Sequence, residues 1–255
     1  MIATSVPLGW RMLIYFVVGV AAGISNGVAG GGTFLTFPSM LALGVPALQA
    51  NVSSSVGVLP SYIGGMREFR HALGPHWRLI RQLLPACIAG VATGAALLLV
   101  GSPDVFRSVV PWLIALGTLL FASGPWITKR IAHLGHHGMR RRALFIGIFV
   151  VSIYGGYFGA GLGILLLAVM GLTVTDEIAT LQGLRSVLST IINATAALIF
   201  VVRGHLVLEA VSMLLVGTLL GGVLGALLIS RLSPRTVRVV IVAVGIATAI
   251  RLWVS

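Results

Sequence analysis

Apolar residues dominate the chain in long runs, and the length of these runs sets the scale of its structure. No Asp, Glu, Lys or Arg occurs from Met12 to Met66, from Ala143 to Thr175 or from Ala210 to Ser230. A helix crosses the hydrocarbon core of a bilayer with about 20 apolar residues. Because irregular backbone cannot face lipid, the runs predict an all-α, polytopic membrane protein.

Proline, glycine and charged residues coincide where the runs are interrupted, and they divide the chain into helical segments. The segments at 33–43 and 162–172 are too short to cross a bilayer, so each is a broken or re-entrant helix. The fold then has eight to ten helical segments, according to how these two are counted. We expect helices over about 10–28, 33–43, 47–66, 79–100, 103–127, 142–158, 162–172, 175–202, 206–230 and 234–254.

Composition and charge agree with a membrane protein and set its expected orientation. Of the 255 residues, 58% are hydrophobic and 9% are charged, whereas soluble domains average about 25% charged. The formal net charge of +12 comes largely from three connections between spans, and basic connections usually lie in the cytoplasm. That placement puts both termini outside and argues against a nucleic-acid partner. The connections carry Arg67, Arg70, Arg78 and Arg81; Lys129, Arg130, Arg140, Arg141 and Arg142; and Arg231, Arg235 and Arg238.

The two halves of the chain are similar, which predicts an internal repeat. "SNGVAGGGTFL" (25–35) aligns with "YGGYFGAGLGIL" (154–165), and two further pairs follow in the same order: "AGVATGAAL" with "GGVLGALL", and "SPDVFR" with "SPRTVR". Five segments in each half would invert the second copy in the membrane, an arrangement typical of secondary transporters. We expect a first repeat at 10–127, a basic cytoplasmic linker at 128–142 and a second repeat at 143–254.

Three segments of the chain resemble the sulfite exporter TauE/SafE family. They are "SNGVAGGGTFLTFPSMLALGVP", "YGGYFGAGLGILLLAVMGL" and "GLRSVLSTIINATAALIFVVRGHL", and the resemblance extends from about Gly19 to Trp253. It implies a permease of the bacterial inner membrane for small anions, with sulfite and organosulfonates as the substrates usually proposed. Members of the family often carry Ala-Thr-Asn or Gly-Thr-Asn after the first short helix, whereas Ala50 precedes Asn51 in this chain.

The paired glycine clusters predict an anion site. Glycine costs about 1 kcal/mol relative to alanine inside a helix, so each cluster favours a break. The first N–H groups of the helix that follows a break, together with the positive end of its dipole, can bind an anion. We expect Gly31, Gly32 and Thr33 to contribute from the first break, and Gly161 and Gly163 from the second. The alternative is that these glycines only allow close helix packing.

Arg185 is a second candidate, because it lies within an expected membrane helix. Intramembrane charge indicates a functional site by default, and the planar guanidinium matches two oxygens of a sulfonate or sulfite. Gln182 and Ser189 lie on a neighbouring stripe of the same helix. Asn51 and Ser54 are the related polar residues of the first repeat. Arg185 could instead extend to the membrane interface, and the polar residues could serve only interhelical hydrogen bonds.

The positions of the acidic and histidine residues limit the function classes. All five acids and six histidines fall at expected helix ends or in connections, so the sequence offers no proton relay and no metal or cofactor site. We expect a secondary transporter of a small sulfur-containing anion, such as sulfite or an organosulfonate, by alternating access around a midplane site. An anion channel with the same site and, less favoured, an integral membrane enzyme are the alternatives. A homo-oligomer is compatible with the sequence.

Overall fold

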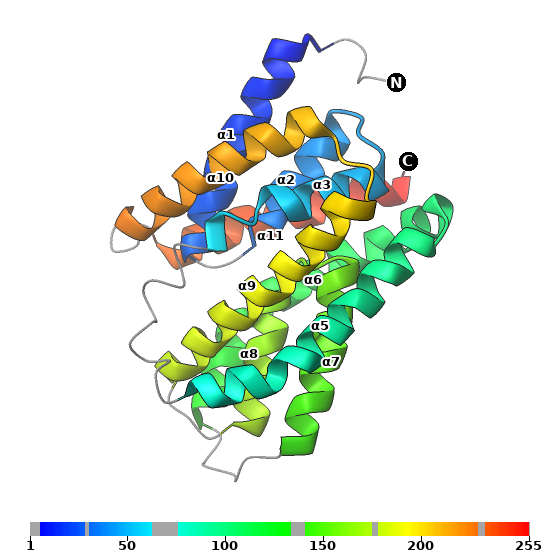
Figure 1. The fold of residues 1–255 in the computed structure, drawn as a ribbon. Helices are drawn as coiled ribbons and strands as arrows, with labels where there is room; N and C mark the ends of the chain where they lie inside the picture. The colour runs from blue at the N-terminus through cyan, green and yellow to red at the C-terminus, as the bar shows by residue number, and fades with distance from the viewer. Residues whose placement is uncertain are drawn as a thin grey trace.

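The computed structural model describes residues 6–28, 31–62, 76–133, 141–174, 178–228 and 233–254. Within these ranges the regular secondary structure is entirely helical, which confirms the all-α fold. The helices are α1 (Leu8–Val28), α2 (Thr33–Ala42), α3 (Ala47–Gly57), α5 (Trp77–Val100), α6 (Pro103–His133), α7 (Arg141–Tyr157), α8 (Leu162–Thr173), α9 (Ile178–Arg203), α10 (Leu208–Leu228) and α11 (Pro234–Val254) (Figure 1).

Six of the described helices are long and apolar enough to cross a membrane: α1, α5, α6, α9, α10 and α11. The helices α2 and α8 are apolar but shorter, and they begin at the residues expected for the two broken segments. The chain is therefore a multi-pass membrane protein, and two short apolar helices accompany its long spans.

Two helix ends differ from the sequence prediction. We expected one helix from 47 to 66, but α3 ends at Gly57 and a turn follows at 58–60. Pro60 explains this end, because it has no N–H and disfavours helical backbone at the residue before it. The α6 helix continues to His133 instead of ending near Ile127, so the start of the expected linker is helical. The division into two repeats and a linker stays a prediction.

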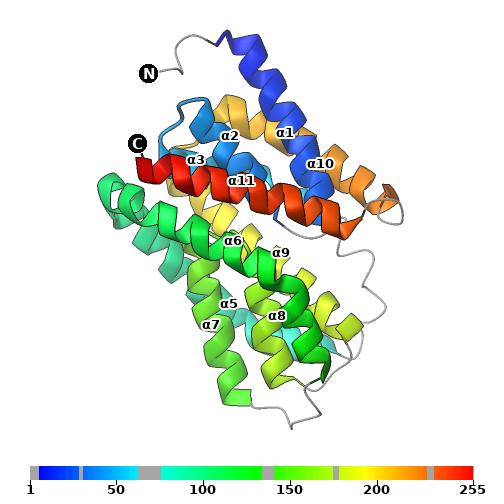
Figure 2. The same ribbon diagram turned by 180° about the vertical axis from the view of Figure 1, so that it is seen from behind.

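The most extensive helix packing joins one half of the chain to the other. The α1 helix lies along α10, and α5 lies along α7. The α6 and α11 helices run beside each other on the face of the molecule that is turned to the viewer in Figure 2. If α1 to α6 are matched in order with α7 to α11, the α1–α10 pair corresponds to α7–α5, and the α6–α11 pair corresponds to itself. The packing is thus consistent with two inverted repeats.

Glycines allow the close approach in both of these exchanged pairs. A Cβ atom at Gly94 of α5 would lie 2.0 Å from the carbonyl oxygen of Ile153 in α7. A Cβ atom at Gly221 of α10 would lie 2.1 Å from the carbonyl oxygen of Val20 in α1. Backbones can meet this closely only where the side chain is missing, as is common between membrane helices. The glycines at the second matched pair of sequence segments therefore serve packing.

The two ends of the molecule are distinct. The turn between α5 and α6 lies beside the C-terminal end of α11 (Figures 1 and 2). There Trp112 and Trp253 pack with their ring centroids 5.0 Å apart. The end of α6 and the start of α7, which carry Lys129, Arg130, Arg141 and Arg142, lie toward the opposite end. This arrangement agrees with the expected parity of the spans, and which end faces the cytoplasm stays a prediction.

Alanine at Gly94 tests the role of close packing. The added methyl would push against the α7 backbone, so we expect the variant Gly94→Ala to lose about 1–3 kcal/mol of stability, seen as a lower thermal unfolding midpoint in detergent. Gly9→Ala is the matched control, because nothing lies within 4 Å of a Cβ there. Equal midpoints for the two variants would contradict the packing role.

Candidate functional site

The two helix breaks depend on glycine for their backbone conformation. Gly31, just before α2, has φ +121°, and Gly161, just before α8, has φ +78°. L-residues with a side chain rarely adopt these values, whereas glycine does so at no steric penalty. Each break therefore places a glycine directly ahead of a short helix and turns the N-terminus of that helix into the interior.

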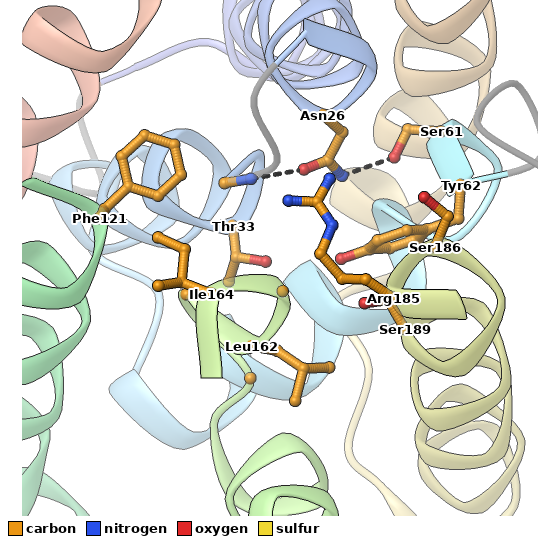
Figure 3. Close-up of a pocket in the computed structure, with 14 residues that line it drawn as sticks. Asn26, Thr33, Ser61, Tyr62, Phe121, Leu162, Ile164, Arg185, Ser186 and Ser189 are labelled. Atoms are coloured by element: carbon orange, nitrogen blue, oxygen red, sulfur yellow. Dashed lines mark hydrogen bonds between the residues drawn. The ribbon is translucent and has the colours of Figure 1, made fainter. Parts of the chain in front are cut away.

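A cavity of about 60 Å³ lies where the two breaks meet (Figure 3). One water molecule needs roughly 10–15 Å³ of such space, so the cavity can hold a few waters or a small ion. Residues from six parts of the chain surround it, and both halves of the chain contribute. The lining residues are Asn26, Gly31, Thr33, Ser61, Tyr62, Phe121, Gly159, Gly161, Leu162, Gly163, Ile164, Arg185, Ser186 and Ser189.

The side chain of Asn26 closes the first break. Its Oδ1 accepts hydrogen bonds from the N–H groups of Gly31 at 2.8 Å and Gly32 at 2.6 Å. Its Nδ2 donates to Ser61 Oγ at 2.7 Å. An asparagine of α1 thus caps the start of α2 in the way that asparagine caps many helices. The two N–H groups that the sequence suggested as free anion donors are used inside the protein.

The second break leaves unpaired donors in residues that line the cavity. In the described part of the chain, the N–H groups of Gly161 and Gly163 have no hydrogen-bond partner. The carbonyl groups nearby are satisfied, since Tyr154 Oη donates to the Ala160 oxygen and the N–H of Leu162 donates to the Gly159 oxygen. The start of α8 therefore presents donors without acceptors, which is the character of an anion site.

Arg185 faces these donors from α9. A Cβ atom at Gly163 would lie 3.5 Å from Cδ, 3.6 Å from Nε and 3.7 Å from Cζ of Arg185. Figure 3 shows the Arg185 side chain extending across the cavity toward Asn26. Arg185 forms no ion pair with any described residue. The salt bridge present among the described residues joins Arg11 and Glu209 instead. The guanidinium and the open N–H groups therefore converge on one small volume with no described counter-ion.

Six of the ten residues expected from sequence line this cavity, and four do not. Gly32 packs on α1, where a Cβ would lie 2.8 Å from the Ala22 oxygen. Ser54 shares a hydrogen bond with the Thr36 hydroxyl. Asn51 Nδ2 donates to the Tyr157 oxygen at 3.0 Å. Gln182 also lies outside the lining. The six that the structure brings together are Gly31, Thr33, Gly161, Gly163, Arg185 and Ser189.

Several residues that line the cavity were not predicted from the sequence. Asn26 had a usable signal, because it is a capping residue type directly before a glycine cluster in an apolar run. Ser61 and Tyr62 follow the unexpected end of α3, so their position depended on a break that the prediction missed. Phe121 carries no signal, since an aromatic residue in a long span is ordinary.

The chemistry of the cavity suits binding. The described residues of its lining offer backbone N–H groups, one guanidinium, one amide and several hydroxyls, and none of them carries a carboxylate or imidazole. Within the described ranges, no group of three or more His, Cys, Asp or Glu side chains is placed to hold a metal ion. The residues present can hold and orient a small anion, and they do not form a nucleophile and base pair.

Comparison with known proteins identifies the family. The family described as sulfite exporter TauE/SafE matches residues 15–252. A probable membrane transporter protein, ORF9, from Sinorhizobium sp. is 27% identical over 96% of this chain and 94% of its own length. The probable membrane transporter protein YfcA of Escherichia coli K12 is 24% identical over 94% of this chain and 88% of its own length. A probable membrane transporter protein of Haemophilus influenzae is 23% identical over 91% of this chain and 90% of its own length. The described residues include six helices apolar and long enough to span a membrane, and the chain is a membrane permease that belongs to the sulfite exporter TauE/SafE family.

Proposed function

We propose that this protein is a secondary transporter that binds a small sulfur-containing oxyanion, sulfite or an organosulfonate, in the cavity between the two helix breaks. One observation carries the proposal. Arg185 and the open N–H groups of Gly161 and Gly163 face the same volume, and no described acid neutralises them. A positive charge without a described counter-ion, beside unpaired N–H donors, favours an anion.

Arg185 gives the proposed site its geometry. A guanidinium presents parallel N–H groups that match two oxygens of a pyramidal sulfite or a tetrahedral sulfonate. The N–H groups at the start of α8 and the positive end of its dipole act on the remaining oxygen from the other side. The hydroxyls of Thr33 and Ser189 also line the cavity and can donate to it.

The position of Arg185 favours a substrate role over simple snorkelling. The residue lies inside the span Thr180–Arg203. Its side chain lines the same cavity as the residues of the two helix breaks. A snorkelling arginine extends to the nearest interface and keeps its head in water. An arginine that is held at the meeting point of two repeats is expensive in a bilayer, and such residues mark substrate pathways.

The proposed cycle is alternating access around this cavity. Helices of both repeats line it, among them α1 and α6 of the first and α9 of the second. A rocking motion of one repeat against the other would therefore open it to each side in turn. An anion channel is the second candidate, because the same site could stay open to both sides. The family of the chain and the absence of a catalytic group from the lining both favour transport over an enzyme.

Counterflow in proteoliposomes separates a carrier from a channel. We expect unlabelled sulfite inside the vesicles to accelerate the uptake of labelled sulfite, because a carrier returns faster when it is loaded. Vesicles without protein, and vesicles loaded with chloride, are the controls. Uptake that does not respond to internal sulfite, but follows the membrane potential, would support the channel.

Replacement of Arg185 tests the charge in the cavity. We expect Arg185→Gln to weaken sulfite binding by about 10- to 100-fold, because a charge-assisted hydrogen bond contributes about 1.5–3 kcal/mol. The measurement is ligand-dependent thermal stabilisation of the purified protein. Arg203→Gln makes the same change at the exposed end of the same helix and should bind as the wild type does. Equal stabilisation of both variants by sulfite would remove Arg185 from the site.

A methyl group at Gly163 tests the shape of the cavity. Its backbone conformation accepts alanine, and the new Cβ would make ordinary contact with Arg185. We therefore expect Gly163→Ala to fold normally and to lose affinity, more for bulky organosulfonates than for sulfite. Gly124→Ala on α6 is the control, since its Cβ would meet only Ile164, at 3.4 Å or more. Undiminished transport by Gly163→Ala would show that the anion binds elsewhere.

A further inference from the structure

A second hollow lies on the side of the molecule and shares no residue with the anion cavity. It is a groove of about 890 Å³ between α1, α2, the first turn of α6 and the last turns of α11. The walls are mainly apolar side chains of three helices, among them Val18 and Ala21 of α1, Leu35 of α2 and Val244 and Ala247 of α11. Ala21 and Ala247 are exposed, so the groove opens to the surroundings of the spans.

One end of this groove carries charge. Arg107 of α6 and Arg251 of α11 line it together with Asp104, and all three side chains are exposed. In the part of the chain that the structure describes, neither arginine forms a salt bridge. Two arginines and one aspartate leave a local charge of +1, which a single negative charge would balance.

An aromatic pair marks the level of this charged end. Trp112 and Trp253 pack against each other at 5.0 Å between ring centroids, although 64% and 60% of their surfaces are exposed. Trp253 follows Arg251 by two positions on α11, and Trp112 follows Arg107 on α6. Exposed tryptophans on spans gather at the headgroup region of a bilayer. The groove therefore runs from headgroup level into the hydrocarbon region.

We propose that this groove is a binding site for one anionic phospholipid, with its phosphate at Arg107 and Arg251 and an acyl chain along α1, α2 and α11. A phosphodiester carries a single negative charge, which balances the local charge of +1 from the two arginines and Asp104. Arginine pairs with phosphate through parallel N–H groups, and basic pockets between spans bind anionic headgroups. The apolar walls take the acyl chain, as hydrocarbon does in the bilayer.

The walls argue against the other occupants. A path for a hydrated anion would need free polar groups along its length. Apart from the charged end, the polar side chains of this groove are Ser39 and Thr248, and both hydroxyls donate to carbonyl oxygens of their own helices. A second copy of the chain would have to fit around exposed charge at the rim, where Asp104 and both arginines lie. A lipid matches both the charged end and the apolar length.

Lipid retention by the full-length protein tests the proposal. Purified, delipidated protein is offered phosphatidylglycerol, phosphatidylcholine or phosphatidylethanolamine with the same acyl chains, or inorganic phosphate alone. Native mass spectrometry counts the bound lipids, and thermal unfolding reports stabilisation. We expect one retained phosphatidylglycerol per chain, weaker retention of the other two lipids and no stabilisation by inorganic phosphate.

Two pairs of variants locate the lipid. Arg107→Gln with Arg251→Gln should lower phosphatidylglycerol retention by roughly 30-fold, because each arginine near the surface contributes about one kcal/mol and about 1.4 kcal/mol corresponds to a factor of ten. Arg78→Gln with Arg81→Gln removes the same charge from two exposed arginines of α5 and should retain the lipid. Ala247→Phe should also lower retention by filling the groove, whereas Ala92→Phe, at an exposed position of α5, should not.

Four outcomes would overturn the proposal. Equal retention of phosphatidylglycerol and phosphatidylcholine by the wild type would remove the charge argument, even if the variants failed to fold. Equal loss in both arginine pairs would indicate general attraction of the headgroup. Stabilisation by inorganic phosphate alone would indicate a site for free anions, and a dimer that retains no lipid would indicate that a second copy covers the groove.

Discussion

A helix that breaks inside a bilayer leaves backbone N–H and C=O groups where no water can satisfy them, and this constraint governs the centre of the structure. The protein meets it differently at its two breaks. At the first break, the amide of Asn26 accepts from the N–H groups of Gly31 and Gly32. At the second, Tyr154 donates to a carbonyl, whereas the N–H groups of Gly161 and Gly163, which line the cavity, have no hydrogen-bond partner in the described part of the chain.

The exchanged packing of the two halves keeps the breaks opposite each other. The α1 helix, which ends at the first break, is fixed along α10 of the second half, and α7, which ends at the second break, is fixed along α5 of the first. Glycines such as Gly94 and Gly221 bring these helices into backbone contact. Each break directly follows a helix that packs on the other half of the chain. A movement of one half relative to the other must therefore change the shape of the cavity between the breaks.

The sequence predicted the elements of the fold better than the details of the site. Long charge-free runs and glycine clusters determine the spans and the short helices, because bilayer thickness and helix geometry leave few alternatives. The end of α3 was missed, since Pro60 was read as part of a continuous apolar helix. The inward position of Arg185 followed from its place in a span. The roles of Asn26 and Phe121 did not, because a capping bond and a neighbour from a distant helix depend on tertiary contacts that no local pattern records.

The two breaks share a backbone design but differ in side chains, and this difference bears on the proposed site. The alignment that matches Gly27 with Gly156 also matches Asn26 with Gly155, so the second half has no side chain to cap its break. The second half instead supplies Arg185 beside the uncapped start of α8. In the proposed site, therefore, the second repeat holds the anion. In the first repeat, Asn26 occupies the N–H groups of Gly31 and Gly32, and this break forms the opposing wall. An anion bound in this way moves with the second repeat, and access from either side depends on how the capped wall of the first repeat is positioned against it.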